Sequence, residues 1–171
     1  HVSDNEFRTL NGEKVKGFQE LLIANVLYLD GIEYIYEDPY VSKRRIEENI
    51  DYRPDFHIKG SNIYIEHFGI DRAGNTRTGI DAEKYNSDII LKRELHRECE
   101  TILIETFHYE WIEETLHQNL EEKLIRHGLR LSPISYESIL KKLHEEGKIS
   151  TWSELFLKAL QAIRVERLTK N

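Results

Sequence analysis

The chain has 171 residues, of which 39% are hydrophobic and 32% charged, a balance typical of one globular domain. Its net charge of −7 argues against tight binding of bare nucleic acid by bulk electrostatics, but it leaves room for a local basic groove or a carboxylate metal site. No apolar run approaches the roughly 18 residues of a membrane span. The single cysteine, Cys99, excludes an internal disulfide and a cysteine-based zinc site.

The same features lead to expectations about the origin of the chain. The lone cysteine and the absence of a signal peptide favour a cytoplasmic protein with no membrane partner. The chain begins at His1 and contains no methionine, so we expect a fragment of a longer protein. Residues 1–13 are polar, and we expect them to be a frayed lead-in. Nothing in the sequence indicates an oligomeric state.

The first predicted element is an apolar helix over Phe18–Leu29, ended by Asp30 and Gly31. Glu20 stands out in it, because it lies on or beside the packed face. It is either a functional carboxylate or a first-turn glutamate that the helix dipole favours.

A strand over Ile32–Tyr36 follows, because apolar residues alternate there. Residues Ser42–Asn49 are a charged connector, which we expect to be a solvated loop. Its basic cluster, Lys43-Arg44-Arg45, could contact phosphate.

The stretch Tyr52–Phe68 predicts two short strands joined by a turn over residues 59–62. Gly60 suits the positive φ of a tight hairpin turn. With Gly60 and Ser61 at the tip, paired residue numbers sum to 121, so Asp55 is predicted to lie opposite Glu66. Side chains opposed in this way have Cβ atoms about 4.5–5.5 Å apart.

Two carboxylates at that distance repel each other unless a positive group lies between them. A divalent cation would serve, because Mg²⁺ binds hard oxygen ligands. Two alternatives remain open at this point. Asp55 and Glu66 could be ordinary solvated acids, and a register slip of one residue would place them on opposite faces of the sheet.

The next segment, Gly69–Gly79, is a polar loop of unusual length, typical of mobile or functional loops. It carries no phosphate-binding GxxxxGK[ST] pattern, and neither does any other part of the chain. Asp81 then caps a predicted helix that ends near Glu98. Lys92 interrupts the inward stripe of this helix, so it either snorkels past the core or points at a functional site.

A strand over Thr101–Phe107 carries Glu105 as its one charge. Three amphipathic helices are predicted after it, the last with a capping box from Thr151 to Glu154; they cover Ile112–His127, Tyr136–Glu146 and Trp152–Leu168. Up to Phe107 the order is helix, three strands, helix, strand. This order predicts an α/β fold with a mixed central sheet flanked by helices.

The αβββαβ order, with Pro54-Asp55 in one strand and Glu66 in the next, resembles the restriction-endonuclease-like PD-(D/E)xK nucleases. More narrowly, the chain is similar to the nuclease-like domain of DNA helicase IV proteins, which are Rep-type superfamily 1 helicases; the blocks are KVKGFQELLIANVLYLDGIEYIYEDPY, YRPDF, YIEHFGIDRAGNT, DAEKYN, LKRELHRE and ILIETFHYE. The resemblance covers residues 14–130. Residues 131–171 would be a helical extension towards the helicase motor.

The resemblance implies partners and an activity for the chain. The partners would be DNA and the motor domains of a parent helicase, which would bind ATP and act in DNA unwinding and repair. The domain would hydrolyse DNA phosphodiesters with Mg²⁺ or Mn²⁺ as cofactor. Asp55 and Glu66 match the metal-binding acidic pair of the family, the backbone carbonyl of His67 matches the main-chain ligand, and Glu20 matches a glutamate that helps to hold metal or water.

One position departs from the family pattern, because Phe68 stands where the motif lysine is expected. Lys92 is the candidate replacement, and it would orient the attacking water or offset charge on the phosphoryl oxygens. His57 and Tyr64 share the face of the acidic pair and could contact substrate or form surface hydrogen bonds. The His67 imidazole is expected on the opposite face.

Glu105 is expected either to support the site or to form an edge-strand salt bridge. Two other functions compete with the nuclease. The first is a catalytically silent member of the fold that binds DNA or docks the motor, which Phe68 favours. The second is a structural interaction domain, which the acidic net charge favours. The second explains Glu20 and Lys92 poorly, because charges set into apolar stripes need partners.

Overall fold

A computed structural model describes residues 7–145, apart from the Arg45 side chain. The chain divides into two compact units, His1–Ser132 and Pro133–Asn171. The predicted helix Trp152–Leu168 and its capping box lie outside the described residues. Within residues 7–145, no helix is both long enough and apolar enough to cross a bilayer.

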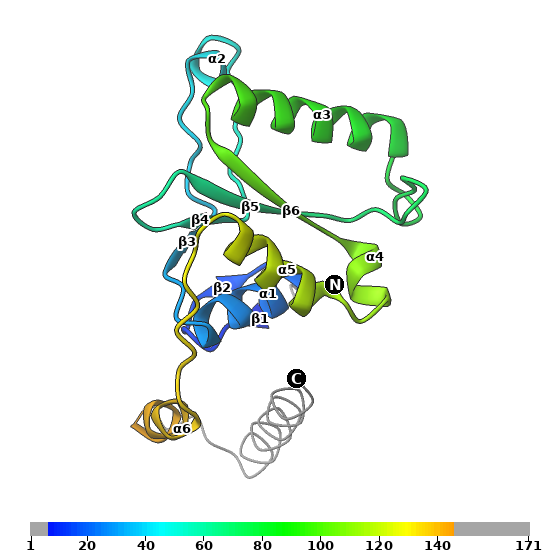
Figure 1. Ribbon diagram of the computed structural model, residues 1–171. Coiled ribbons are helices and arrows are strands. Elements are labelled where there is room, and N and C mark those ends of the chain that lie inside the picture. Colours follow the sequence, from blue (N-terminus) through cyan, green and yellow to red (C-terminus); the bar gives the residue numbers. More distant parts are fainter. Residues whose placement is uncertain (1–6, 146–171) are drawn as a thin grey trace. The chain divides into compact units, whose positions relative to one another are not determined.

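The first unit is built on a four-stranded sheet with the order β3-β4-β5-β6 (Figure 1). Its strands are β3 (Tyr34–Tyr36), β4 (Phe56–Ile58), β5 (Ile63–Phe68) and β6 (Ile102–Phe107). The first three strands are antiparallel and β6 runs parallel to β5. A parallel neighbour requires a crossover, and helix α3 (Ala82–Glu98) supplies it.

Helices cover both faces of this sheet (Figure 1). On one face, α1 (Phe18–Leu29) and α5 (Leu116–Arg126) bury a shared core with the strands. On the other face lies α3, whose Leu95 packs with Tyr40 and Tyr52. The predicted α/β class with a mixed sheet is therefore present.

The register of the β4–β5 hairpin is the predicted one, because Phe56 pairs with Ile65 and His57 with Tyr64. Gly60 at the turn has a φ of +72°. Asp55 immediately precedes β4, so it lies opposite Glu66, and the alternation of the strands directs both towards α3. A register slip is excluded.

Residues at the helix ends also predicted the bounds of the two long helices correctly. The predicted α1 and α3 begin and end where the sequence indicated. The Asp81 carboxylate accepts hydrogen bonds from the backbone N–H groups of Glu83 and Lys84, at 3.0 and 3.1 Å. This confirms the predicted N-cap.

Two flanking strands are shorter than predicted. The Ile32 N–H closes the end of α1 by bonding to the Leu27 carbonyl, and β3 starts only at Tyr34. In the same way the Thr101 N–H bonds to the His96 carbonyl, so β6 starts at Ile102.

Three segments differ more strongly from the predictions. The lead-in contains strand β1 (Phe7–Arg8), which pairs with β2 (Lys14–Val15) directly after it. The charged connector contains a short helix, α2 (Lys43–Glu47), where a loop was expected.

The predicted helix Ile112–His127 is present as α5, which starts only at Leu116, and a separate short helix, α4 (His108–Ile112), precedes it. The chain turns at Glu114, whose φ is +59°, and Thr115 donates its N–H to the Glu110 carbonyl. In the second unit, α6 (Tyr136–Glu145) matches its prediction up to the last described residue.

Candidate functional site

Asp55 and Glu66 are held together at the point where β4 begins beside β5. The Asp55 N–H donates to Glu66 Oε2 at 3.2 Å. Beyond the last β4 pair, the His67 N–H has no strand partner on that side, and it donates to Asp55 Oδ2 at 2.7 Å. Glu66 is only 4% exposed. Glu66 is therefore not a solvated surface acid, whereas Asp55 is half-buried.

Lys92 reaches this pair from α3. Its ammonium donates to Glu66 Oε1, and the lysine side chain is only 29% exposed. The nitrogen also lies 5.4 Å from the centroid of the Tyr52 ring. Lys92 therefore points at the acidic pair and does not snorkel to solvent.

Glu20 approaches the same region from the first turn of α1. Its carboxylate accepts a hydrogen bond from the Tyr36 hydroxyl, and its charge acts on the Asp55 carboxyl. A Cβ atom at Gly17 would lie 3.1 Å from Glu20 Oε1, so the glycine leaves room for the carboxylate. The ligand atoms of Glu20, Asp55 and Glu66 are not gathered within 4.8 Å of one another.

Burial controls the protonation of the pair. Removal from water, followed by the neighbouring charge of Glu66, raises the pKa of Asp55 well above its usual range. Burial also raises the pKa of Glu66, against the opposing charge of Lys92. Since each carboxylate disfavours ionisation of the other, a further cation would be needed to keep both fully charged.

A buried hydrogen-bonded chain leads away from Glu66, and sequence reasoning missed it. The Tyr52 hydroxyl lies 3.4 Å from Glu66 Oε2 and 3.1 Å from His96 Nε2. His96 Nδ1 then lies 2.7 Å from the Thr101 hydroxyl, which meets that of Tyr40 at 2.6 Å. Burial and the charge of Lys92 lower the pKa of His96 to about 4, so the ring is neutral at pH 7. The sequence did contain one indication of this chain: His96 follows Lys92 by about one helical turn, so both lie on the same face of the helix.

The His67 imidazole points to the other face of the sheet, as predicted. It contacts Gln19 of α1 through Nε2 and the Thr106 hydroxyl through Nδ1, the latter at 2.9 Å. The Gln19 amide also lies 2.8 Å from His108 Nδ1. Burial lowers the pKa of His67 to about 4. Gln19, His67 and His108 border a cleft of about 640 Å³ that Glu20 also lines.

His57 and Tyr64 lie on the α3 face, as expected, and serve the structure there. His57 Nδ1 lies 2.6 Å from Asp38 and Nε2 lies 3.0 Å from the Ser61 carbonyl oxygen. The two rings stack at a centroid distance of 4.2 Å. The contacts of His57 match the interpretation of a rim residue that forms hydrogen bonds, whereas Tyr64 contributes ring contacts.

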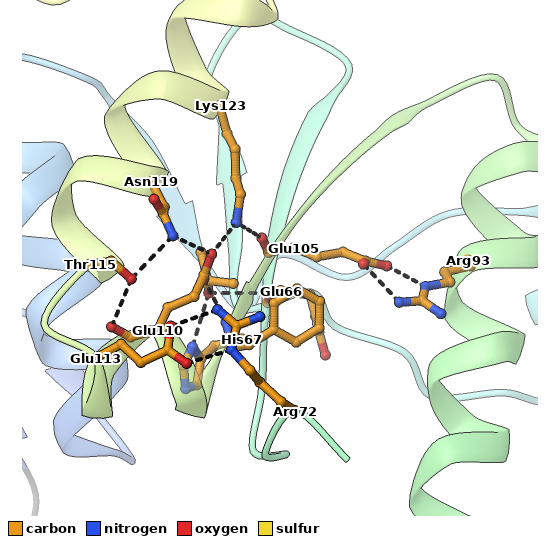
Figure 2. Close-up of polar contacts among 12 residues, drawn as sticks. Glu66, His67, Arg72, Arg93, Glu105, Glu110, Glu113, Thr115, Asn119 and Lys123 are labelled. Atoms are coloured by element: carbon orange, nitrogen blue, oxygen red, sulfur yellow. Dashed lines mark hydrogen bonds and ion pairs between the residues drawn. The ribbon is translucent and has the colours of Figure 1, made fainter. Parts of the chain in front are cut away.

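Glu105 forms the edge-strand salt bridge that was one of its two predicted roles. Its two carboxylate oxygens pair with the Arg93 guanidinium of α3 at 2.5 and 2.8 Å (Figure 2). In the basic cluster of α2, Arg44 pairs with Glu48, Glu94 and Glu98 at 3.1–3.3 Å, so its charge is already matched by carboxylates.

A second buried carboxylate, Glu110, was not predicted. It accepts hydrogen bonds from the Phe107 N–H at 2.9 Å, from the Asn119 amide at 2.9 Å and from the Lys123 ammonium at 2.7 Å (Figure 2). Lys123 also donates to the Glu105 carbonyl at 2.8 Å. These contacts join α4, α5 and the end of β6.

Another group of possible metal ligands lies at the end of α1. Ligand atoms of Asp30, His117 and Glu121 fall within 4.8 Å of one another, and His117 Nε2 lies 2.9 Å from Glu121 Oε1. None of these residues was predicted to bind metal. The signal was the spacing of His117 and Glu121 by about one turn of α5.

Comparisons with known proteins assign the chain to no family. No family model matches it, and no solved structure matches it. An uncharacterized protein of Methanocaldococcus jannaschii is similar over 74 residues, with 38% identity. The match covers 41% of this chain and 6% of that protein, so the chain spans a small part of the length of its relative.

Proposed function

We propose that this chain is a metal-dependent nuclease domain that hydrolyses DNA phosphodiesters. The observation that carries the proposal is the contact of Lys92 with Glu66, directly beside Asp55. The three residues come from separate segments, and they bring two carboxylates and an ammonium group to one buried position. This combination is suited to phosphoryl chemistry, where developing negative charge must be offset.

The fold supports a restriction-endonuclease-like core, which is part of the proposal. Apart from α2, the elements from α1 to β6 follow the order helix, three strands, helix, strand. The acidic pair lies where two adjacent central strands diverge. The resemblance to the nuclease-like domain of helicase IV proteins extends the proposal to a parent helicase, whose motor would be the partner and would bind ATP.

The donor set suits Mg²⁺ or Mn²⁺. Asp55 and Glu66 supply carboxylate oxygens, and the His67 carbonyl faces the same edge as the Asp55 carboxylate, because the N–H and C=O of one strand residue point to the same side. Hard oxygen donors are the ligands these cations prefer. When bound, the cation would polarise the phosphate and lower the pKa of a coordinated water.

The protein's own groups would position the reactants. The Lys92 ammonium, held beside Glu66, is placed to orient a water or to offset charge on the phosphoryl oxygens. Glu20, held by the Tyr36 hydroxyl, is placed to bind a water on the α1 side. The Tyr52 hydroxyl contacts Glu66 and is itself held by the neutral His96 ring.

A second candidate is a catalytically silent domain of the same fold that binds DNA or docks a motor. One observation favours it. The acidic pair is satisfied by protein groups alone, since Lys92 neutralises Glu66 and the His67 N–H bonds to Asp55. The position two residues after Glu66 also carries Phe68.

Cleavage of single- and double-stranded DNA with Mg²⁺ or Mn²⁺ separates the two candidates. Under the nuclease proposal, Asp55→Asn and Lys92→Met each lower the cleavage rate by about 100-fold or more. Glu105→Gln is the matched control, because Glu105 lies on the same face one strand away and pairs with Arg93. Equal cleavage by wild type and Asp55→Asn would reject the nuclease. DNA binding without cleavage would support the silent domain.

A further inference from the structure

A cleft of about 640 Å³ opens on the α1 side of the first unit, lined by the His67 ring, whose residue follows Glu66 in β5. Its walls are the start of α1, the polar loop after β5 and helix α4. The volume falls in the range of about 300–1,000 Å³ that is usual for small-molecule sites. The cleft can therefore take one nucleotide unit, and it is too small for a duplex.

Two exposed aromatic rings lie in this cleft. Phe18 is 47% exposed and Trp111 is 37% exposed, although both are large apolar side chains. Their ring centroids are 6.3 Å apart with planes at 75°. Aromatic rings exposed in a concave site are the usual platforms for unstacked bases, and each base stack contributes to affinity whatever the base.

The polar wall of the cleft carries hydrogen-bonding groups for a base edge. The Gln19 amide lies between the His67 and His108 rings. Since the Gln19 Nε2 group donates to His108 Nδ1, His108 Nε2 is the ring nitrogen that carries a proton. Such a ring N–H can donate to the carbonyl oxygen of a base, and the adjacent Trp111 ring, 5.6 Å away, offers a stacking face.

The charges that line the cleft favour stacking of a base on the aromatic rings over binding of phosphate groups. Among the described residues that line the cleft, Arg77 is cationic, and Glu20 and Asp71 are anionic. Duplex binding depends on several Lys or Arg contacts to phosphate, which this lining does not offer. Stacking on aromatic rings does not require such charge, and it requires bases that are free of a duplex.

His67 connects the cleft to the acidic pair, because its ring lines the cleft and its backbone N–H donates to Asp55 Oδ2 at 2.7 Å. On the basis of the proposed nuclease function, we infer that the cleft receives an unstacked base of single-stranded DNA. Phe18 and Trp111 hold the base, and the adjoining phosphodiester lies towards Asp55 and Glu66. The substrate class is therefore single-stranded DNA or a frayed end.

The test is DNA binding in EDTA, where no cleavage occurs. The full chain is titrated against a labelled oligothymidylate and against a hairpin duplex of equal nucleotide number, with fluorescence anisotropy as the readout. We expect the single strand to bind more tightly than the duplex. Trp111→Leu and Phe18→Leu should each weaken single-strand binding by about 5- to 100-fold, the range for loss of one base–aromatic stack.

Two control variants separate stacking from folding. Trp111→Phe keeps an aromatic ring and should bind within a few-fold of wild type. Ile112→Ala removes an exposed apolar side chain on the same helix outside the cleft, and it should bind as wild type does. Circular dichroism melts verify that each variant is folded.

Three results would overturn the inference: no binding of the oligothymidylate, equal or tighter binding of the duplex, or wild-type affinity in folded Trp111→Leu. The nuclease proposal fails separately. Asp55→Asn should still bind the single strand in EDTA. Wild-type protein that binds the single strand in EDTA but cleaves no DNA in Mg²⁺ would reject the nuclease and retain the base-binding cleft.

Discussion

The Lys92 ammonium lies 5.7 Å from the centroid of the Phe68 ring, on the face of the sheet where Glu66 also projects. Phe68 occupies the strand position two residues after Glu66 and is buried with Ile70 and Ile89. Phe68 thus packs in the core, while Lys92 of helix α3 places a positive charge beside Glu66.

Lys92→Met should lower the free energy of unfolding by about 1–3 kcal/mol, because it leaves the buried Glu66 without its counter-charge. Adding Glu66→Gln to this variant should recover part of the loss, since the pair is strongly coupled. Urea denaturation of the wild type, the two single variants and the double variant gives the coupling energy. Strictly additive losses would show that the ammonium does not stabilise the carboxylate.

Mn²⁺ should raise the melting temperature of the wild type but not that of Asp55→Asn. At a metal concentration of about 100 times Kd, the stabilisation would be about 2.7 kcal/mol. The raised pKa of Asp55 means that protons compete with the metal, so the shift should shrink as pH falls from 8 to 5. A shift that persists in Asp55→Asn would locate the metal elsewhere, and Asp30, His117 and Glu121 would be tested next.

The stability of the domain should fall as pH drops below about 6.5, partly because of His96. Its pKa in the folded protein is about 4, whereas an unfolded histidine titrates near 6.5, so acid protonates the unfolded chain first. This difference contributes up to about 2 kcal/mol of lost stability between pH 7 and pH 5. His96→Gln should have a flatter profile of unfolding free energy against pH. An unchanged slope in that variant would contradict the assignment of a buried neutral ring.

Glu110→Gln should destabilise the domain by about 1–3 kcal/mol, because the variant removes the charge that Lys123 and Asn119 bind in a buried position. The matched control is Glu47→Gln in the exposed pair with Lys43, where the loss should be below about 0.5 kcal/mol. Chemical denaturation measures both. Equal losses in the two variants would show that burial does not strengthen the Glu110 contacts.

Much of the fold was predictable where short-range chemistry determines it. Gly60 gave the hairpin register, and Asp81 gave the start of α3. The break between α4 and α5 was not predictable from helical periodicity, because the contacts of Glu110 with Asn119 and Lys123 hold it in place. Helix α2 also depends on distant residues, since Arg44 pairs with Glu94 and Glu98 of α3.

The candidate site divides in the same way. Register alone placed Asp55 beside Glu66, and an interrupted apolar stripe singled out Lys92. The residues behind and beside them were missed for a physical reason. Tyr52 and His96 meet only after the strand and α3 pack together, and Gln19 finds His67 only across the opposite face. Sequence periodicity indicates which side a residue faces, but not which distant partner it meets there.

His67 belongs to both sides of the sheet. Its backbone N–H bonds to the Asp55 carboxylate, while its ring bonds to Gln19 in the wall of the cleft. A molecule that shifts the His67 ring would therefore also move the backbone N–H that binds the Asp55 carboxylate, with no other side chain in between. By thermodynamic reciprocity, any effect of a molecule in the cleft on cation affinity at the acidic pair equals the effect of that cation on the affinity of the cleft. Strand β5 would in this way link the cleft on the α1 face to the acidic pair on the α3 face.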